Sequence, residues 1–178
     1  LWDEHKRIMK NFSIEKKYSD INADPSFLDL KIELSQRMLN ECIMCEHLCQ
    51  VNRNESETGF CGLGSESRIS SAFLHHGEES PLIPSGTIFF VGCNFDCCFC
   101  QNYDISQFGK KQPLSKKPSS VSAQGLAMIG NNLIDHGALN VNYVGGDPTP
   151  HMATILKSLS YQTKNACQLW NSNFYISQ

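Results

Sequence analysis

The run Gly86-Thr-Ile-Phe-Phe-Val-Gly92 is the stretch that decides the fold. A short β-branched and aromatic run bounded by glycines is typical of a buried parallel strand. It leads directly into Cys93-Asn-Phe-Asp-Cys97-Cys-Phe-Cys100. The sequence therefore predicts a buried strand that carries a cysteine-rich loop at its carboxyl end.

Strand and helix signals alternate downstream of this loop. A helix capped by Ser119 or Ser120 is expected to run through Ile134, and Gly137 stands where a helix-terminating glycine belongs. Further segments are predicted as a strand over 140–144, a helix over 150–161 and a strand over 167–170. This alternation indicates an α/β fold built from parallel β/α units. Functional residues of such sheets gather at the carboxyl ends of the strands.

The upstream part has a different character. A helix capped by Ser26 is expected from Phe27 to about Asn40, and a strand over 68–75. Between them lies a loop-like segment, too polar to fold by apolar burial alone. It holds Cys42, Cys45, Cys49 and Cys61. We divide the chain into an N-terminal helical and cysteine-rich segment, 1–66, and an α/β core, 67–178.

Composition excludes several classes of protein. The 178 residues carry a net charge of -3, which provides no basic field for nucleic acid. The longest apolar run falls far short of the ~20 residues that cross a bilayer, and no secretory signal is recognisable. We expect a cytoplasmic protein without a membrane or nucleic-acid partner. Nine clustered cysteines in that setting indicate metal or redox chemistry rather than disulfides.

The spacing of Cys93, Cys97 and Cys100 suits an iron–sulfur cluster. Three thiolates can bind three of the four irons of a [4Fe–4S] cubane and leave one iron open. Cys98 is out of register with them and is expected to pack in the interior, as is Cys167 at the start of a strand.

Taken together, the motifs resemble the radical S-adenosylmethionine (radical SAM) superfamily, and more closely the PflX-type proteins that are similar to pyruvate formate-lyase activating enzyme. The resemblance covers nearly everything from Cys42 onward. It rests on Cys42-Ile-Met-Cys45, Cys49-Gln-Val-Asn52-Arg53, Gly59-Phe-Cys61-Gly62, His76-Gly-Glu78-Glu79, Gly86 to Asn94, Cys100-Gln-Asn102, Gly145-Gly-Asp-Pro-Thr-Pro-His151 and Trp170-Asn-Ser-Asn173.

The resemblance implies a fold and an activity. The fold would be a partial (β/α) barrel, truncated after its third strand. Since the chain opens on Leu1 and stops at Gln178, we expect a fragment with an open sheet edge. The activity would be reductive cleavage of S-adenosylmethionine to a 5′-deoxyadenosyl radical, which abstracts hydrogen. The implied partners are a protein substrate of the glycyl-radical type and an electron donor such as flavodoxin or ferredoxin.

The resemblance also assigns residues to the cosubstrate. The methionine amino group would meet the motif Gly145, Gly146 and Asp147, where the family usually has glutamate in place of the aspartate. Phe99 would lie against adenine, and Asn171 and Asn173 would supply polar contacts. Glycines permit close backbone approach, and a carboxylate accepts hydrogen bonds from an ammonium.

Two further functions stay open on the sequence alone. One is an iron–sulfur electron carrier without radical chemistry, and the other is a zinc-binding interaction module. The second would use Cys42, Cys45, Cys49 and Cys61, whose number suits structural zinc or a second iron–sulfur cluster equally well. His47 could replace one of these ligands.

Overall fold

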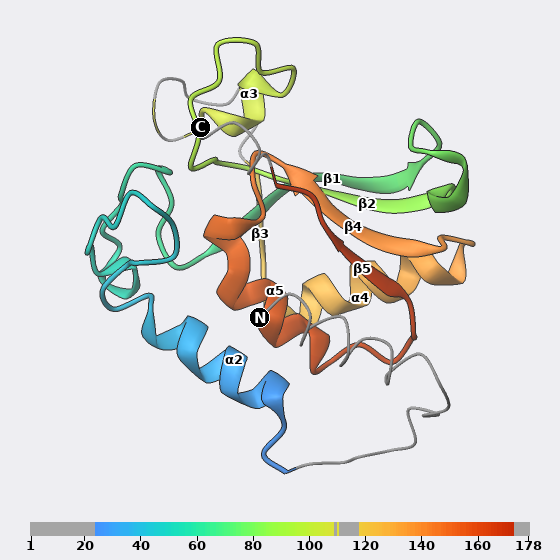
Figure 1. Ribbon diagram of the computed structural model, residues 1–178, viewed down its shortest axis with the longest axis horizontal. Helices are drawn as coiled ribbons and strands as arrows, with labels where there is room; N and C mark the ends of the chain where they lie inside the picture. Colours follow the sequence, from blue (N-terminus) through green and yellow to red (C-terminus); the bar gives the residue numbers. More distant parts are fainter. Residues whose placement is uncertain (1–23, 109, 111–117, 173–178) are drawn as a thin grey trace, which may run out of the picture.

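A computed structural model describes residues 24–108, 110 and 118–172. Its centre is an open five-stranded sheet with the strand order β3-β1-β2-β4-β5 (Figure 1). The strands are β1 (Ser67–His75), β2 (Ser85–Phe90), β3 (Ser119–Val121), β4 (Asn140–Gly145) and β5 (Cys167–Trp170). The helices are α2 (Phe27–Arg37), α3 (Tyr103–Ser106), α4 (Ala123–Asp135) and α5 (Met152–Leu159). Short 3-10 turns span Arg53–Glu55, Ser80–Leu82 and Thr149–His151.

The predicted β/α units are present. Strands β2, β4 and β5 run parallel and lie side by side in chain order. The strand predicted over 86–92 ends two residues early, at Phe90. β1 pairs antiparallel with β2, and β3 pairs antiparallel with β1. The sheet is therefore mixed: β1 covers one edge of the parallel part, and β5 is the outer strand at the other end.

The two faces of the sheet differ in chemistry. One face carries Ile88, Phe90, Val141 and Tyr143, which pack with Leu126 of α4 and Ile155 of α5; Figure 1 shows both helices beneath the sheet. Alternate residues of β2 and β4 point the other way. Four of them are polar and nevertheless buried: Ser85, Thr87, Asn140 and Asn142. The Ser85 hydroxyl donates to Asn140 Oδ1 at 2.7 Å, so burial of this pair is compensated.

Most of the helix boundaries agree with the sequence prediction. Ser26 forms a capping box with Asp29, and α2 ends at Arg37, three residues before the expected end. Gly137 follows α4 with a φ of 100°. The predicted cap of α4 was wrong, because Ser122 accepts from the Gly125 N–H and caps the helix.

Ser119 and Ser120 belong instead to β3. They pair with Ile69 and Arg68 of β1. This pairing satisfies backbone N–H and C=O groups along the free edge of β1. A helix that began at Ser119 or Ser120 would have left those groups unpaired.

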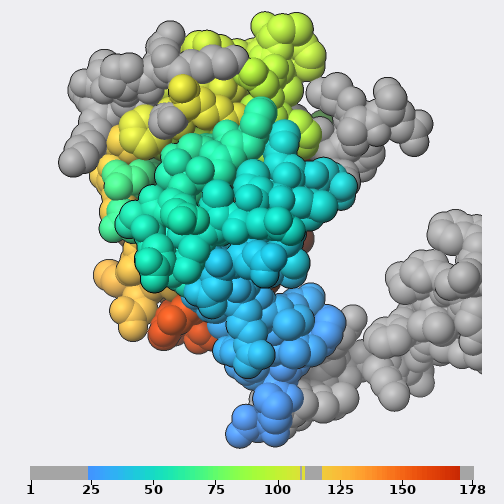
Figure 2. Space-filling model, turned by 90° about the vertical axis from the view of Figure 1, so that its left-hand side faces the viewer, coloured from blue at the N-terminus to red at the C-terminus, as the bar shows by residue number. Residues whose placement is uncertain are grey.

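The segment 38–64 lies against one end of the core. Figure 2 shows it as a continuous surface between α2 and the region of the cysteine loop. A small apolar cluster joins it to α5, formed by Leu39, Cys42, Met44 and Ala153. Gly92 makes a second junction, since its missing side chain leaves room for Leu63, which is 2% exposed. The segment expected to be too polar to fold by apolar burial alone thus docks through a few apolar contacts and through Arg53, described below.

Candidate cysteine site at the carboxyl ends of the strands

The loop that follows β2 holds the three predicted cluster ligands. Cys93 is buried, whereas Cys97 and Cys100 are half-buried. The loop turns on itself, because the Cys100 N–H donates to Cys97 O at 3.3 Å. Its two ends meet where the Gly92 N–H donates to Ile105 O at 2.8 Å. The structure therefore gathers the three cysteines on one closed loop above the end of a buried strand.

The Cys93 thiol is shielded from solvent. Burial raises its pKa to about 12, against the lowering effect of the Phe95 N–H, which donates to the sulfur at 3.3 Å. The negative charge of Asp147 raises it further. A thiol in such surroundings stays protonated unless a metal takes the place of the proton. The same amide that donates to the thiol would support a thiolate ligand.

The two glycines at the end of β4, Gly145 and Gly146, pack against the start of this loop. Gly145 has a φ of 112°, and a Cβ there would collide with the backbone of Phe90. A Cβ on Gly146 would collide with the Gly92 carbonyl oxygen. The Gly146 N–H donates to Phe90 O at 2.9 Å, and the Asp147 N–H donates to Gly92 O at 3.2 Å. This glycine bend, 145–147, therefore lies directly against the strand end that carries the cysteines.

Asn102 ties the two motifs together a second time. Its amide Nδ2 donates to Gly145 O at 3.3 Å. The structure shows it reaching from the cysteine loop to the glycine bend.

The carboxylate of Asp147 already has partners. It is 1% exposed, and its Oδ1 accepts from the Thr149 N–H at 2.8 Å. Its Oδ2 accepts from the Ser172 hydroxyl at 2.6 Å. Each carboxylate oxygen can accept a further hydrogen bond. Asp147 therefore shapes the turn after β4, whatever else it binds.

The remaining predicted cosubstrate residues are more peripheral. Phe99 is 66% exposed at the tip of the cysteine loop. Asn171 follows β5, and its N–H donates to Tyr143 O at 3.1 Å, which extends the sheet by one bond. Asn173 lies outside the described residues.

The two cysteines expected in the interior were predicted wrongly. Cys98 and Cys167 are both exposed. Cys98 points out of a loop whose neighbouring cysteines turn inward, and Cys167 lies at the start of the outer strand β5. Free cysteine is often buried, but these two positions lack an element that could cover them.

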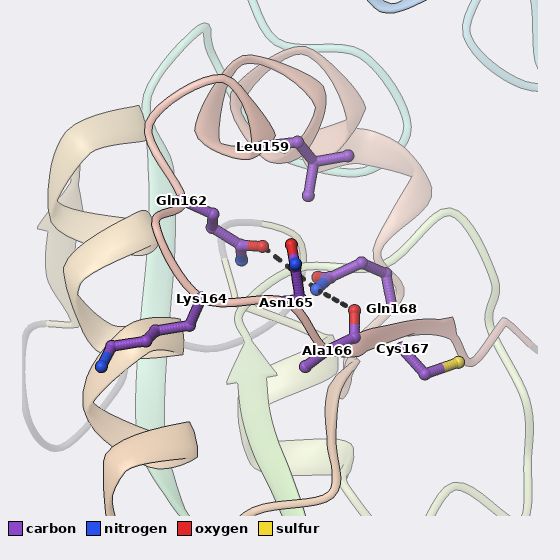
Figure 3. A pocket seen from close by; sticks show the side chains of 7 residues that line it. All are labelled: Leu159, Gln162, Lys164, Asn165, Ala166, Cys167 and Gln168. Carbon is purple, nitrogen blue, oxygen red and sulfur yellow. Dashed lines mark hydrogen bonds between the residues drawn. The ribbon is translucent and has the colours of Figure 1, made fainter. Parts of the chain in front are cut away.

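A shallow hollow of about 530 Å³ lies near Cys167, lined by residues of the loop between α5 and β5. Figure 3 shows the Gln162 and Gln168 amides hydrogen-bonded to each other across it. It is at the amino end of β5, away from the cysteine loop, and takes no part in this site.

The four cysteines of the segment 38–64 come near one another. Burial is the main cause that raises the pKa of Cys45 and of Cys61. The charges of neighbouring thiols of this set raise both values further. Among the described residues, no three His, Cys, Asp or Glu side chains converge closely enough to ligate a single metal ion.

His47, considered above as a possible metal ligand, contacts Asn94 and Phe60 instead. Its Nε2 donates to Asn94 O at 2.8 Å, and its ring stacks on Phe60 with centroids 3.8 Å apart. The contact with Asn94 joins the N-terminal cysteine segment to the loop of Cys93.

Two buried residues near these motifs had no role in the sequence prediction. Arg53 is 2% exposed and bonds to Gly64 O at 2.6 Å and to Pro150 O at 2.9 Å. His151 donates from Nε2 to Val91 O at 3.0 Å, and burial lowers its pKa to about 3. Both lie within quoted motifs, yet neither their burial nor their partners can be deduced from residue type alone.

The described part of the chain contains no helix that is long and apolar enough to cross a bilayer. No solved structure matches the sequence significantly. An uncharacterized protein of Methanocaldococcus jannaschii is 45% identical over 179 residues, which is 99% of this chain and 52% of that protein. The chain thus spans about half the length of the curated relative that it matches. Residues 85–178, more than half of the chain and including the whole cysteine loop and glycine bend, match the 4Fe-4S single cluster domain, and the chain belongs to that family.

Proposed function

We propose that this chain is part of a radical SAM enzyme of the PflX type, an oxidoreductase related to glycyl-radical activases. The observation that carries the proposal is the contact between the cysteine loop and the glycine bend. They follow β2 and β4, which are adjacent parallel strands, and are joined by hydrogen bonds from Gly146, Asp147 and Asn102. An electron carrier needs the cysteine loop but has no need of a glycine bend held beside it.

Cys93, Cys97 and Cys100 would hold the cluster. The donor set fits, because the three thiols share one closed loop and the Phe95 N–H is already directed at the Cys93 sulfur. Cys98 is exposed and out of register with these three cysteines, so it does not belong to the ligand set. When bound, a [4Fe–4S] cluster with an open iron supplies the electron that cleaves S-adenosylmethionine.

The glycine bend would receive the methionine end of the cosubstrate. Two glycines without side chains allow close approach to the backbone. Asp147 supplies negative charge near Cys93, on the side where an ammonium would be stabilised. Asp147 is one methylene shorter than the glutamate usual in the family, and its oxygens hold Thr149 and Ser172, so a bridging water is the simplest link to that ammonium. Phe99, Asn171 and Asn173 would complete the adenosine side.

We further propose that the sheet is the first half of a (β/α) barrel. Strands β2, β4 and β5 would be its first three strands, and later strands would add beside β5. The relative, about twice as long as this chain, has room for them. A protein of the glycyl-radical type is the proposed substrate, with flavodoxin or ferredoxin as the proposed reductant.

The test is reductive cleavage under anaerobic conditions. The 178-residue protein and the full-length Methanocaldococcus jannaschii relative are reconstituted with iron and sulfide and reduced with dithionite. 5′-Deoxyadenosine is then quantified by chromatography. We expect cleavage by the longer protein and far less by the 178-residue chain, because an incomplete barrel leaves the radical site open to water.

Matched cysteine variants of the 178-residue chain serve as controls. Relative to the unmodified chain, Cys97→Ala should lose the cluster held by Cys93, Cys97 and Cys100, about four irons per chain, whereas Cys98→Ala should keep it. An iron-replete longer protein that forms no 5′-deoxyadenosine would contradict the proposal and favour an electron carrier.

A further inference from the structure

We propose that Cys42, Cys45, Cys49 and Cys61 form a second metal centre, held by four thiolates and partly neutralised by the buried Arg53. The family match begins at residue 85 and does not include these cysteines. The inference is independent of radical chemistry, because it depends only on the segment 38–64 and its contact with the core.

The backbone brings the cysteines together by turns that cost energy. The Cys42 N–H donates to Val51 O and the Gln50 N–H donates to Cys42 O, both at 3.0 Å, so the chain returns beside its starting point. Leu48 and Gln50 have φ angles of 41° and 57°, a region that non-glycine residues rarely occupy. Strained turns of this kind persist where the surrounding structure has a use for them.

Backbone amides point at the sulfur atoms of the set. Burial raises the pKa of the Cys45 and Cys61 thiols, and the backbone N–H groups of His47 and Leu63, each two residues along the chain, act in the opposite direction. This is the arrangement of Phe95 and Cys93 in the loop of the core. N–H donors directed at sulfur are the hydrogen bonds that a metal-bound thiolate accepts.

Cys49 is approached by a donor from farther along the chain. The Phe60 N–H approaches its sulfur at 3.4 Å. A Cβ on Gly59 would lie 2.7 Å from that sulfur, so the glycine makes room for it.

Arg53 provides the electrostatic argument. Its Nε and Nη2 donate to Gly64 O, its Nη2 also to Pro150 O, and its Nη1 approaches the Met44 sulfur. Within the described ranges, no carboxylate lies at ion-pair distance from this guanidinium. A buried cation without an anion is costly. Its charge reaches the Cys61 thiol, so an anionic thiolate centre there would supply the missing counter-charge.

Zinc and an iron–sulfur cluster share this donor chemistry. Four thiolates with either one Zn²⁺ or an oxidised cubane carry a net negative charge. The thiols do not converge on a point that one ion could occupy as they stand. Binding would draw the side chains inward, more for zinc than for a cubane, whose thiolates bind different irons and stand farther apart.

The test separates this centre from the one in the core. The variant Cys93→Ala/Cys97→Ala/Cys100→Ala of the whole 178-residue chain is purified anaerobically, with and without added iron and sulfide. Iron, sulfide and zinc per chain are measured by mass spectrometry and sulfide assay. We expect this variant to retain one zinc, or about four irons with four sulfides, per chain. Folded protein without stoichiometric metal would overturn the proposal.

A second comparison does not depend on whether the triple variant folds. In the otherwise unmodified chain, Cys45→Ser/Cys49→Ser should lose that same metal while the cluster of the core stays. The control Cys98→Ser/Cys167→Ser changes two exposed cysteines and should lose none. Equal metal content in the two double variants would also overturn the proposal, and this result does not depend on whether S-adenosylmethionine is cleaved.

Discussion

The two cysteine-bearing regions of this molecule are positioned by different forces. The loop 93–100 leaves a buried strand, and the glycine bend of the next parallel strand holds it in place. The segment 38–64 has no strand or long helix of its own beyond the end of α2. It is held by a small apolar cluster and by hydrogen bonds from one buried arginine. The first region therefore depends on close backbone packing, and the second on a small apolar cluster and a few polar contacts.

This difference has a consequence for stability. Backbone packing inside a sheet cannot relax when it is disturbed, so damage there should affect the whole domain. A segment docked by polar contacts can separate locally while the sheet persists. Three substitutions test this contrast, from the largest expected effect to the smallest.

Gly146→Ala disturbs the backbone packing between the glycine bend and the strand end that carries the cysteine loop. The added Cβ would collide with the Gly92 carbonyl oxygen, a backbone atom that cannot rotate out of the way as a side chain could. We expect the unfolding free energy to fall by about 3 kcal/mol or more, measured by urea denaturation with circular dichroism.

Gly137→Ala is the matched control for this substitution. That glycine has a positive φ but open space around its Cβ, so its replacement should cost only about 1 kcal/mol. Equal losses for the two variants would show that the glycine bend is not a rigid contact.

Arg53→Met weakens the contact between the segment 38–64 and the core. It keeps the length of the side chain but leaves Gly64 O and Pro150 O without their donor. We expect a loss of about 2 kcal/mol. Hydrogen exchange should accelerate in 42–64 before it changes in β2 and β4. Arg37→Met removes only an exposed pair with Glu33 and should cost less than about 0.5 kcal/mol. Exchange that accelerates first in the sheet would argue that the two regions form one unit.

His151 lies at the junction and gives the smallest effect. Burial lowers its pKa to about 3 from an ordinary 6.5. Between those values the unfolded chain binds a proton that the folded chain does not. The unfolding free energy should therefore fall as the pH drops below about 6.5, by at most about 1.4 kcal/mol per pH unit from this group.

The measurement compares urea unfolding at pH 7.0 and 5.5. His151→Gln should show a shallower decline than the unmodified chain. His136→Gln changes an exposed ring and serves as the control for replacing a histidine. A slope that His151→Gln does not alter would mean that His151 is protonated in the fold.

The sequence predicted the elements that follow from local chemistry. The run 86–92, the cap at Ser26 and the terminating Gly137 were predicted from patterns that act over a few residues, and the structure confirms them with small shifts at the ends. The expected partial barrel stays a prediction, since the sheet described is open and ends at β5.

The parts that were missed depend on distant partners. Residue type does not tell that Ser119 would pair with β1, nor that β1 runs antiparallel to β2. It likewise does not tell that Arg53 would be buried against Pro150, 97 residues away in the chain. Cys98 is a case in which a preference of the residue type misled the prediction. Free cysteine is usually buried, but Cys98 lies in a loop that leaves it exposed.

The antiparallel pairing of β1 with β2 bears on the order in which the protein forms. Only the short connection 76–84 separates these two strands, so closing it costs little chain entropy. β4 reaches β2 only after a crossover that contains α3 and α4. Contacts between residues close in the chain generally form sooner, and we expect the hairpin to be established before β4 arrives. The thiols of Cys93, Cys97 and Cys100 would then be open to a metal donor during synthesis, and the glycine bend would close over them afterwards.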